Sequence, residues 1–435
     1  MTIYSSLAAS VAGLNANAQR LAGISDNIAN SSTFGYKRME TDFHSMVVNG
    51  GQLARGTYTA GGVTTTTHRV ISQPGQVIGT NNPMDITISG RGMLPVTDLA
   101  ALGGGGALPL SLMTTGSFRP DSNGILVNTS GQVLMGWAMN PDGSLPNVTR
   151  DTNASLVPIN IGHNQFVSNP TTAINMGVNL PSYETLAGAA GDPVELSIEY
   201  FGNLGQAESL TVTFTPTVPA TGSSNAWTMV VTDSASGGAV VGEYQLTFND
   251  TATGGGTLAT VTDVSGGPYV PATGAMTITV AGGDIDFNIG QIGARDGMTQ
   301  LASSFAPTSL SKDGSPVGNL IGVEIDPDGM VNAVYDTGFS RPIYQVPLVD
   351  VPNPNGLISM NNQTYKLSME SGPMFLWDAG DGPTGATRGY SLEASTTDVA
   401  VELTNLIQTQ RAYSSNAKVI QTVDEMLQET TNIKR

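Results

Sequence analysis

Large apolar residues recur every seven positions at both ends of this 435-residue chain. In the first thirty residues the row consists of Leu7, Leu14, Leu21 and Ile28. In the last forty it consists of Val399, Leu406, Tyr413, Ile420 and Leu427, with Leu403 widening it. A seven-residue repeat is typical of a helix whose apolar face packs against another helix. The pattern therefore predicts helices over residues 1–30 and 396–435.

Two interpretations of these rows are open. The helices can pack on the chain's own core, which is the commoner outcome for a single helix of this kind. Here no further helical segment lies between them, and an isolated pair of helices is marginal without more surface to bury. We therefore expect helices that stay loose in a monomer and fold against neighbouring copies. The ten row residues, Leu403 included, are the predicted assembly seam.

The ends of the second helix are also marked. Ser395 followed by Asp398 is a variant of the capping box, which predicts a helix start there. Lys434 and Arg435 place positive charge at its carboxyl end, where the helix dipole favours cations.

Between the helices the apolar period changes from seven to two. Apolar and polar residues alternate over 194–200, 210–214, 244–248, 276–280 and 285–289. Such alternation predicts strands with one face on a core and one in water. Asn-Gly, Asp-Gly and Gly-Gly steps separate the runs and favour tight turns. The expected fold class is a mainly β, multi-domain body with paired, coiled-coil-like terminal helices and nested insertions.

Charged residues are unevenly distributed along the chain. The net charge is −18, yet residues 151–294 contain no Lys or Arg and twelve acidic residues. We interpret this block as an inserted, exposed all-β domain that repels its neighbours. Ordinary surface solubility is the simpler account of the same charge.

Composition excludes several classes of function. A strongly acidic chain lacks the basic stripe that nucleic-acid binding needs, and an anionic membrane surface repels it. No apolar run reaches the roughly 20 residues that span a bilayer, so we expect no membrane insertion. Cysteine is absent, which excludes disulfides and thiolate sites. The first cation is Arg20, so we expect no cleavable leader of the ordinary secretory kind.

No residue pattern indicates catalysis. His44, His68 and His163 are far apart in sequence, and none belongs to a metal-spaced cluster. The four glycines at 103–106 lack the Lys-Ser/Thr of a phosphate loop. We expect no cofactor, no metal site and no enzyme activity.

Two acidic clusters have alternative interpretations. Asp326-Pro327-Asp328-Gly329 resembles the start of a calcium loop, but the later bidentate Glu is missing, so a tight turn is favoured. Asp284, Asp286 and Asn288 could bind a cation or serve glycoside hydrolysis. Their alternation places them on one wet strand face, which favours a solvated surface.

Two motifs stand at the ends of the chain. The first is Asp26-Asn-Ile-Ala-Asn-Ser-Ser-Thr-Phe-Gly-Tyr-Lys-Arg38, where a helix ends near Asn30 and Gly35 permits a left-handed bend. The second includes Gln410-Arg-Ala-Tyr-Ser-Ser-Asn-Ala-Lys418. Together they resemble the axial rod and hook protein family of the bacterial flagellum, and interior matches lie at residues 83–90, 116–128, 134–137 and 352–357. The family motif residues are Asp26, Asn27, Asn30, Thr33, Gly35, Tyr36 and Lys37 in the first half, and Gln410, Arg411, Ala412, Tyr413 and Asn416 in the second. One departure is residues 365–388, which are bulkier than the Gly- and Ser-rich passage usual in the family.

The resemblance implies a structural subunit that self-assembles into the flagellar hook, a short curved tube acting as a flexible universal joint between rod and filament. It implies an extracellular location, export by the flagellar machinery, and contacts with further copies, the distal rod, the hook cap and the hook-filament junction. The implied division is an inner-tube domain (1–30 and 396–435), a linker (31–75 and 365–395), a β-rich middle domain (76–165 and 295–364) and the acidic outer domain (166–294). The alternatives are a sibling axial protein and a calcium-stabilised acidic surface-layer protein or adhesin.

Overall fold

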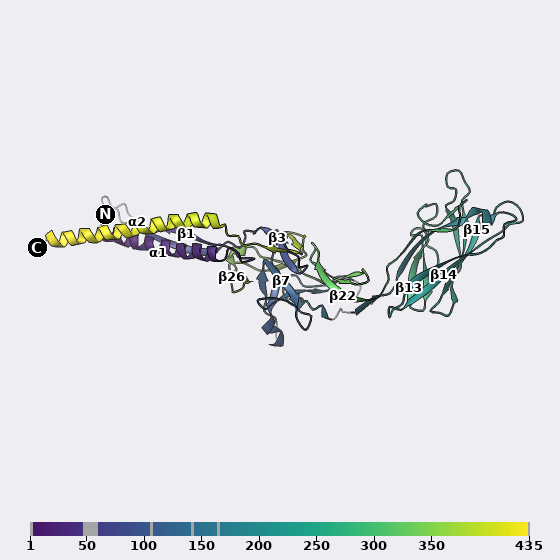
Figure 1. Cartoon of the computed structure of the whole chain (residues 1–435), viewed down its shortest axis with the longest axis horizontal. Helices are drawn as coiled ribbons and strands as arrows, with labels where there is room; N and C mark the ends of the chain where they lie inside the picture. The colour runs from purple at the N-terminus through teal and green to yellow at the C-terminus, as the bar shows by residue number, and fades with distance from the viewer. Residues whose placement is uncertain (1–2, 47–59, 105–107, 141–142, 163–165, 434–435) are drawn as a thin grey trace. The chain divides into compact units, whose positions relative to one another are not determined.

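The computed structural model describes residues 3–46, 60–104, 108–140, 143–162 and 166–433. Two long helices, α1 (Ile3–Ala29) and α2 (Val399–Ile433), stand at the ends of a chain that is otherwise mainly β (Figure 1). The chain divides into two compact units. The first comprises Met1–His163, Gly322–Val334 and Ser340–Arg435, and the second Asn164–Ile321 and Tyr335–Phe339. The expected fold class is confirmed.

The start of α2 is confirmed, but its cap differs from the expected box. Asp398 is the capping residue, because its Oδ1 accepts hydrogen bonds from the backbone N–H groups of Ala400 (2.9 Å) and Val401 (3.3 Å). Ser395 instead accepts a bond from the N–H of Thr397, outside the helix. Lys434 and Arg435 lie outside the described residues.

A hairpin follows α1 and packs along it. Strands β1 (Met39–Ser45) and β2 (Val63–Arg69) pair antiparallel from Met39↔Arg69 to Ser45↔Val63. Both strands contact α1, and α1 also lies beside α2 (Figure 1). A Cβ on Gly23 would lie 3.6 Å from the hydroxyl oxygen of Thr41, so helix and hairpin approach closely there.

The β-body of the first unit is built from short strands around an apolar core. Its centre is the run β24-β9-β5-β6-β27-β26, with Trp137 and Leu112 buried in the adjoining core. The amino-terminal strands are β3 (Val77–Gly79), β4 (Asp85–Ser89), β5 (Leu94–Asp98), β6 (Ser111–Met113), β7 (Thr115–Pro120), β8 (Leu126–Asn128), β9 (Gln132–Ala138) and β10 (Val157–Pro158), with the 3₁₀ helix η1 (Leu99–Gly104). The later ones are β23 (Met330–Tyr335), β24 (Ser340–Gln345), β25 (Leu348–Asp350), β26 (Ile358–Ser359), β27 (Tyr365–Lys366), β28 (Phe375–Trp377), β29 (Ala386–Arg388) and β30 (Ser391–Glu393), with η4 (Pro354–Gly356).

The second unit contains two five-stranded sheets that share one apolar core. One sheet has the antiparallel order β13-β14-β15-β16-β17; the other has the order β18-β19-β12-β20, with β21 also paired to β12. Its elements are β11 (Phe166–Asn169), β12 (Ala173–Pro181), η3 (Ser182–Thr185), β13 (Val194–Phe201), β14 (Ala207–Pro216), β15 (Ala226–Asp233), β16 (Ala239–Phe248), β17 (Leu258–Ser265), β18 (Ala275–Val280), β19 (Gly283–Asn288), β20 (Thr299–Leu301), β21 (Ala306–Lys312) and β22 (Ser315–Ile325), whose last residues belong to the first unit.

The predicted alternation is confirmed in this unit. Leu210, Val212 and Phe214 of β14 are fully buried, while the intervening residues reach solvent. The expected outer boundary at residue 294 differs from the structure. Strands β20 and β21 come after it and pair with β12, so the unit extends to Ile321. The four-part division as a whole stays a prediction.

A buried carboxylate ties the two sheets of this unit together. Asp233, at the end of β15, is completely buried and accepts hydrogen bonds from the hydroxyls of Tyr200 (2.6 Å) and Ser236 (2.6 Å). It also accepts from the backbone N–H of Ala235 and of Ala281, which follows β18. Burial alone would raise the pKa of Asp233, but these bonds outweigh it and lower the pKa.

We expect Asp233→Asn to lower the free energy of unfolding of the second unit by about 1–3 kcal/mol at neutral pH, because an amide cannot replace every accepted bond. The pKa of Asp233 is lower in the folded protein than its unfolded value of about 4. The stability that ionised Asp233 contributes is therefore fully present above that unfolded value and is lost as the pH falls through the folded pKa. Urea unfolding, followed by pulsed hydrogen exchange in β13 and β15, measures both effects. Asp284→Asn, at an exposed site on β19, is the control; an equal loss in both variants would contradict the assignment.

Candidate assembly site at the terminal helix pair

Except for Ile24, the face that α1 buries is made of small and polar residues. Spacings of three and four recur among them, as in Ser10, Gly13 and Asn17, which places them on one helix face. The buried residues are Ser5, Ser10, Gly13, Ala16, Asn17, Gly23, Ile24 and Asn27. A Cβ on Gly13 would lie only 2.9 Å from Nδ2 of Asn416 on α2, so the two helix backbones approach closely at this glycine.

The facing row of α2 is also mostly polar. Glu402, Thr409 and Val423 are 4%, 2% and 3% exposed, and Asn416 between them is half-buried. These positions are seven residues apart, as in a coiled-coil contact. The hydroxyl of Thr409 donates to the carbonyl of Asn405 (2.7 Å), so it is satisfied within its own helix. The contact inside one chain is therefore a close, polar one.

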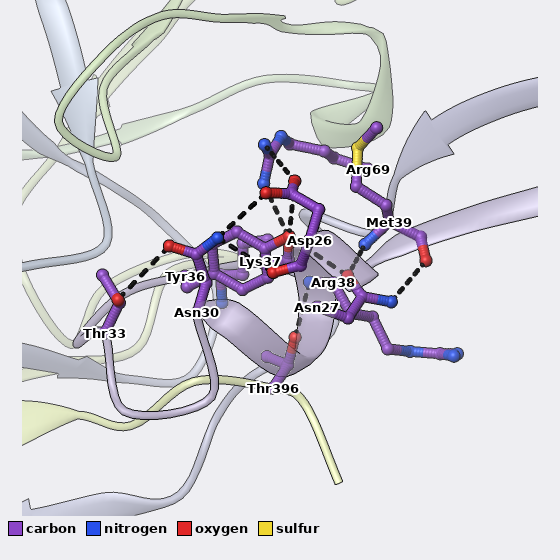
Figure 2. A network of polar contacts seen from close by, with 10 residues as sticks. All are labelled: Asp26, Asn27, Asn30, Thr33, Tyr36, Lys37, Arg38, Met39, Arg69 and Thr396. Atoms are coloured by element: carbon purple, nitrogen blue, oxygen red, sulfur yellow. Dashed lines mark hydrogen bonds and ion pairs between the residues drawn. The ribbon is translucent and has the colours of Figure 1, made fainter. Parts of the chain in front are cut away.

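Asn27 joins α1 to two other segments of the chain, and Figure 2 shows its contact with Met39. Its Nδ2 donates to the carbonyl of Met39 (2.9 Å) and to Oε1 of Glu402 (3.0 Å). Its Oδ1 accepts from the N–H of Met39 (2.7 Å) and lies 3.1 Å from the hydroxyl of Tyr36. Asn27 is 1% exposed, so one buried amide connects α1, the first residue of β1 and the first turn of α2.

Tyr36 and Arg69 extend this network (Figure 2). The Tyr36 hydroxyl donates to Asp26 (3.0 Å), and the guanidinium of Arg69 lies over the Tyr36 ring, 4.9 Å from its centroid. Arg69 also pairs with Asp26 (3.5 Å) and donates to the carbonyl of Lys37 (3.0 Å). Burial, together with the bond to Asp26, raises the pKa of Tyr36 to about 12, so the phenol stays protonated.

A buried ion pair lies beside it. Nζ of Lys37 is 2.6 Å from Oε1 of Glu393 and donates to the carbonyl of Gln73 (2.8 Å). Both charged side chains are almost completely buried, at 2% and 7% exposure. Breaking a buried pair by removing one partner is costly, because the remaining charge is left without compensation.

The turn between α1 and β1 completes the site. Gly35 has φ = +70°, which confirms the left-handed bend expected there, and a Cβ would lie 2.9 Å from Cγ2 of Thr115. Asn30 donates to Asp26 (2.9 and 3.0 Å) and lies 3.4 Å from the hydroxyl of Thr33. Thr396 bonds on both sides of Lys37, to the N–H of Arg38 (2.9 Å) and the carbonyl of Tyr36 (3.1 Å).

The structure gathers the first half of the family motif and spreads out the second. Asp26, Asn27, Asn30, Thr33, Gly35, Tyr36 and Lys37 all belong to the network described above. In the second half, Asn416 contacts the helix pair at Gly13. The other four, Gln410, Arg411, Ala412 and Tyr413, are exposed on α2.

The predicted seam residues are less buried than Glu402, Thr409 and Val423 in the facing row of α2. Leu7, Leu14, Leu21 and Ile28 of α1 are half-buried, as are Leu406, Ile420 and Leu427 of α2. Val399, Leu403 and Tyr413 are 40%, 48% and 44% exposed. Their role as an assembly seam stays a prediction.

Sequence reasoning missed two buried positions of the helix contact, Glu402 and Thr409, and three partners of the motif that lie outside it, Glu393, Arg69 and Thr396. One signal was available for the first two. Glu402, Thr409 and Asn416 are polar residues at seven-residue spacing beside an apolar row, a pattern that fixes register in coiled coils. Glu393 and Arg69 pair across long sequence separations and carry no local signal.

The two acidic clusters form a tight turn and a solvent-exposed strand face. Asp326 Oδ1 accepts from the N–H groups of Asp328 (3.1 Å) and Met330 (2.8 Å), and Gly329 has φ = +79°, which confirms the tight turn. On β19, Asp284 and Asp286 are exposed and accept bonds from Thr279 and Thr277 across the β18 pairing. This confirms a solvated face.

Among the described residues, no group of three or more His, Asp or Glu side chains is arranged to hold a metal ion. Neither α1 nor α2, as far as each is described, is long and apolar enough to cross a membrane. His163 lies outside the described residues.

We expect Asn27→Ala to lower the free energy of unfolding of the helix pair by about 2–3 kcal/mol, because the Met39 backbone and the Glu402 carboxylate lose their buried partner. Asn15→Ala, at an exposed position of the same helix, should change it by no more than ~0.5 kcal/mol. Urea unfolding followed by circular dichroism at the helical band measures the difference. Equal stabilities of the two variants would show that the Asn27 network is not required.

Comparisons with known proteins agree with this architecture. The flagella basal body rod protein family matches residues 7–37, and the C-terminal family of the flagellar basal body rod proteins FlgEFG matches residues 388–433. The D2 domain of the flagellar basal body protein FlaE matches residues 192–315. The first two matches cover the helix pair and its network, and the third lies in the second unit.

Relatives match over the whole length. The flagellar hook protein FlgE of Rhizobium meliloti is 34% identical over 440 residues, covering 100% of both chains. That of Brucella suis is 34% identical over 443 residues, again covering 100% of both. That of Salmonella typhimurium is 28% identical, covering 99% of this chain and 100% of its own. With full-length identity above 30% and with the helix pair built as described, this chain belongs to the flagellar hook protein FlgE family.

Proposed function

We propose that the two apolar rows on α1 and α2 are the surface through which copies of this chain hold one another in the hook. A protein of this family is a structural subunit, not an enzyme; it self-assembles into a short curved tube that works as a flexible joint in the flagellum. The proposal concerns which surface carries that assembly. Its main support is that the face shared by the two helices is mostly small and polar, while the large apolar residues of the rows are half-buried or exposed.

Several apolar side chains on one side of α2 are exposed. Val399, Leu403 and Tyr413 of the seam are joined there by Ile407 (50%). On α1, Tyr4 (73%) and Val11 (43%) are exposed as well. Contiguous apolar surface of this kind marks a protein-protein contact.

The energy available from these rows is substantial. Full burial of one Leu, Val or Ile side chain contributes about 1.5–3 kcal/mol relative to exposure. Each chain has two rows that face neighbours, so burial of the rows stabilises the assembly by several such contributions. The polar contact between Asn27 and Glu402 fixes the register of the two helices within one chain. It contributes little of the free energy of assembly.

A single chain cannot satisfy both rows with its own residues, and contacts between unlike surfaces of identical copies propagate without closing. We assign the helix pair to the inner tube, the β-body of the first unit to the middle layer and the second unit to the outside. This assignment keeps the nested order expected from the sequence. The acidic second unit suits outer contacts that are polar, wet and exchangeable as a bent tube rotates.

The chain assembles with copies of itself and with other flagellar components. We further propose that the same apolar rows, open at the ends of a stack, meet the distal rod, the hook cap and the hook-filament junction. We place the assembled protein outside the cell, after export by the flagellar machinery. The support for both proposals is the family together with the open rows.

We expect Leu403→Asp to keep the monomer folded but to prevent tube formation, because a charge enters a surface that must become dry. Leu403 is already 48% exposed, so the monomer loses little. Gln408→Asp places the same charge at an exposed position on the far side of α2, about 140° around the helix from Leu403, and should polymerise normally. Electron microscopy and sedimentation of the concentrated proteins measure both. Normal tubes from Leu403→Asp would refute the role of the rows.

A further inference from the structure

One side chain of the first unit stands entirely free in solvent. Met369, in the loop after β27, is 101% exposed, the highest value among the exposed large apolar residues that the structure describes. Ile358, Met360 and Leu367, at 52%, 46% and 36%, belong to the same β26–β27 region. This loop belongs to the passage of residues 365–388 that is bulkier than the family pattern.

The loop that carries Met369 is held firmly. The hydroxyl of Ser368 accepts bonds from the N–H groups of Glu370 (3.0 Å) and Ser371 (3.1 Å) and donates to the carbonyl of Gly356. Ser371 is completely buried, and its hydroxyl donates to the carbonyl of Ser368 (2.9 Å). Asn353 braces the loop from outside, with its N–H on the carbonyl of Ser371 (3.1 Å) and Nδ2 on the carbonyl of Glu370 (3.1 Å). An exposed apolar side chain on a fixed loop binds with little ordering cost.

The same unit contains a cavity of about 400 Å³ that nothing in the described chain fills. Its apolar lining is formed by Ile71, Pro74, Ile88, Met93 and Pro354. The volume falls in the ~300–1,000 Å³ range of pockets that enclose a small molecule, so a Met side chain with part of its loop can enter.

The cavity is also lined by Lys37 and Glu393, which are paired with each other, and by Arg91, whose guanidinium suits the residue next to Met369. Arg91 lines it with a side chain 46% exposed, and only two of its donors are used, on Asp350 and on the carbonyl of Val351. A guanidinium has five N–H donors, so Arg91 can bind a further carboxylate. Glu370 is exposed and has no ion pair within the part of the chain that the structure describes.

We propose that Met369 and Glu370 of one copy dock into this cavity on a neighbouring copy, with Met369 on the apolar wall and Glu370 beside Arg91. The loop cannot place Met369 in the cavity of its own chain, because its bonds to Asn353 and Gly356 hold this side chain in solvent. The protrusion and the cavity adjoin through residues 353–356 but are unlike surfaces, so copies joined by this contact form a polymer wherever the rotation between them does not close a ring. This inference rests on the proposed self-assembly and adds a contact between the β-bodies to that of the helices.

Cross-linking tests the contact directly, since the chain has no native cysteine. We would copolymerise two single variants, Ser72→Cys in the cavity lining and Glu370→Cys beside Met369, and then oxidise the tubes. Because each chain has one thiol, a disulfide-linked dimer of the two variants can only join two copies. We expect this heterodimer in tubes but not in the unpolymerised mixture. A copolymer of Ser72→Cys with Leu204→Cys, an 81% exposed site in the second unit, should give none.

A second measurement uses the critical concentration for polymerisation. Met369→Asp should raise it at least about tenfold, because burial of the thioether side chain is lost and a like charge is added beside Glu370. Leu204→Asp should leave it unchanged, and the monomers of both should melt as the wild type does. Normal tubes without the heterodimer, or an unchanged critical concentration in Met369→Asp, would overturn this contact alone. Failure of the wild type to form tubes would instead overturn the proposed assembly.

Discussion

The buried amide of Asn27 holds the two ends of the chain together. It binds both backbone polar groups of Met39 and the carboxylate of Glu402, which lies 375 residues further along the chain. A buried amide with all of its groups satisfied specifies one register, because any slip of the helices would leave several polar groups unpaired. Everything between residues 30 and 398 is therefore inserted between two segments whose meeting point is fixed.

The distribution of polar and apolar residues on the helix pair differs from that in an ordinary helical hairpin. The contact within the chain is made mostly by small and polar residues, with Ile24 and Val423 as larger apolar members, and the leucine rows are half-buried or exposed. A monomer built this way has a defined geometry but an incomplete apolar core. Copies of the same chain can supply the missing surface, so that order within one subunit and cohesion between subunits come from different residues.

Much of the architecture could be predicted from periodicity alone. The seven-residue rows indicated both helices, and the two-residue alternation around Leu210 and Phe214 indicated strands of the second unit. The face that each helix buries could not be predicted, because a row such as Leu7 to Ile28 is compatible with a partner inside or outside the chain. The full extent of the second unit could not be predicted for a related reason: the acidic composition ends near residue 294, but the pairing of β20 and β21 with β12 is a long-range property. The same limit hid Glu393 and Arg69, whose partners Lys37 and Asp26 are distant in sequence.

Thiol accessibility in the two assembly states tests the central claim most directly. With Leu403→Cys as the single thiol of an otherwise cysteine-free chain, a water-soluble maleimide should react rapidly with the monomer and be strongly slowed once tubes have formed. Gln408→Cys, at an exposed position on the far side of α2, should retain more of its reactivity in tubes. If Leu403→Cys reacts in tubes as fast as in monomers, the apolar rows stay wet in the polymer and the account is wrong.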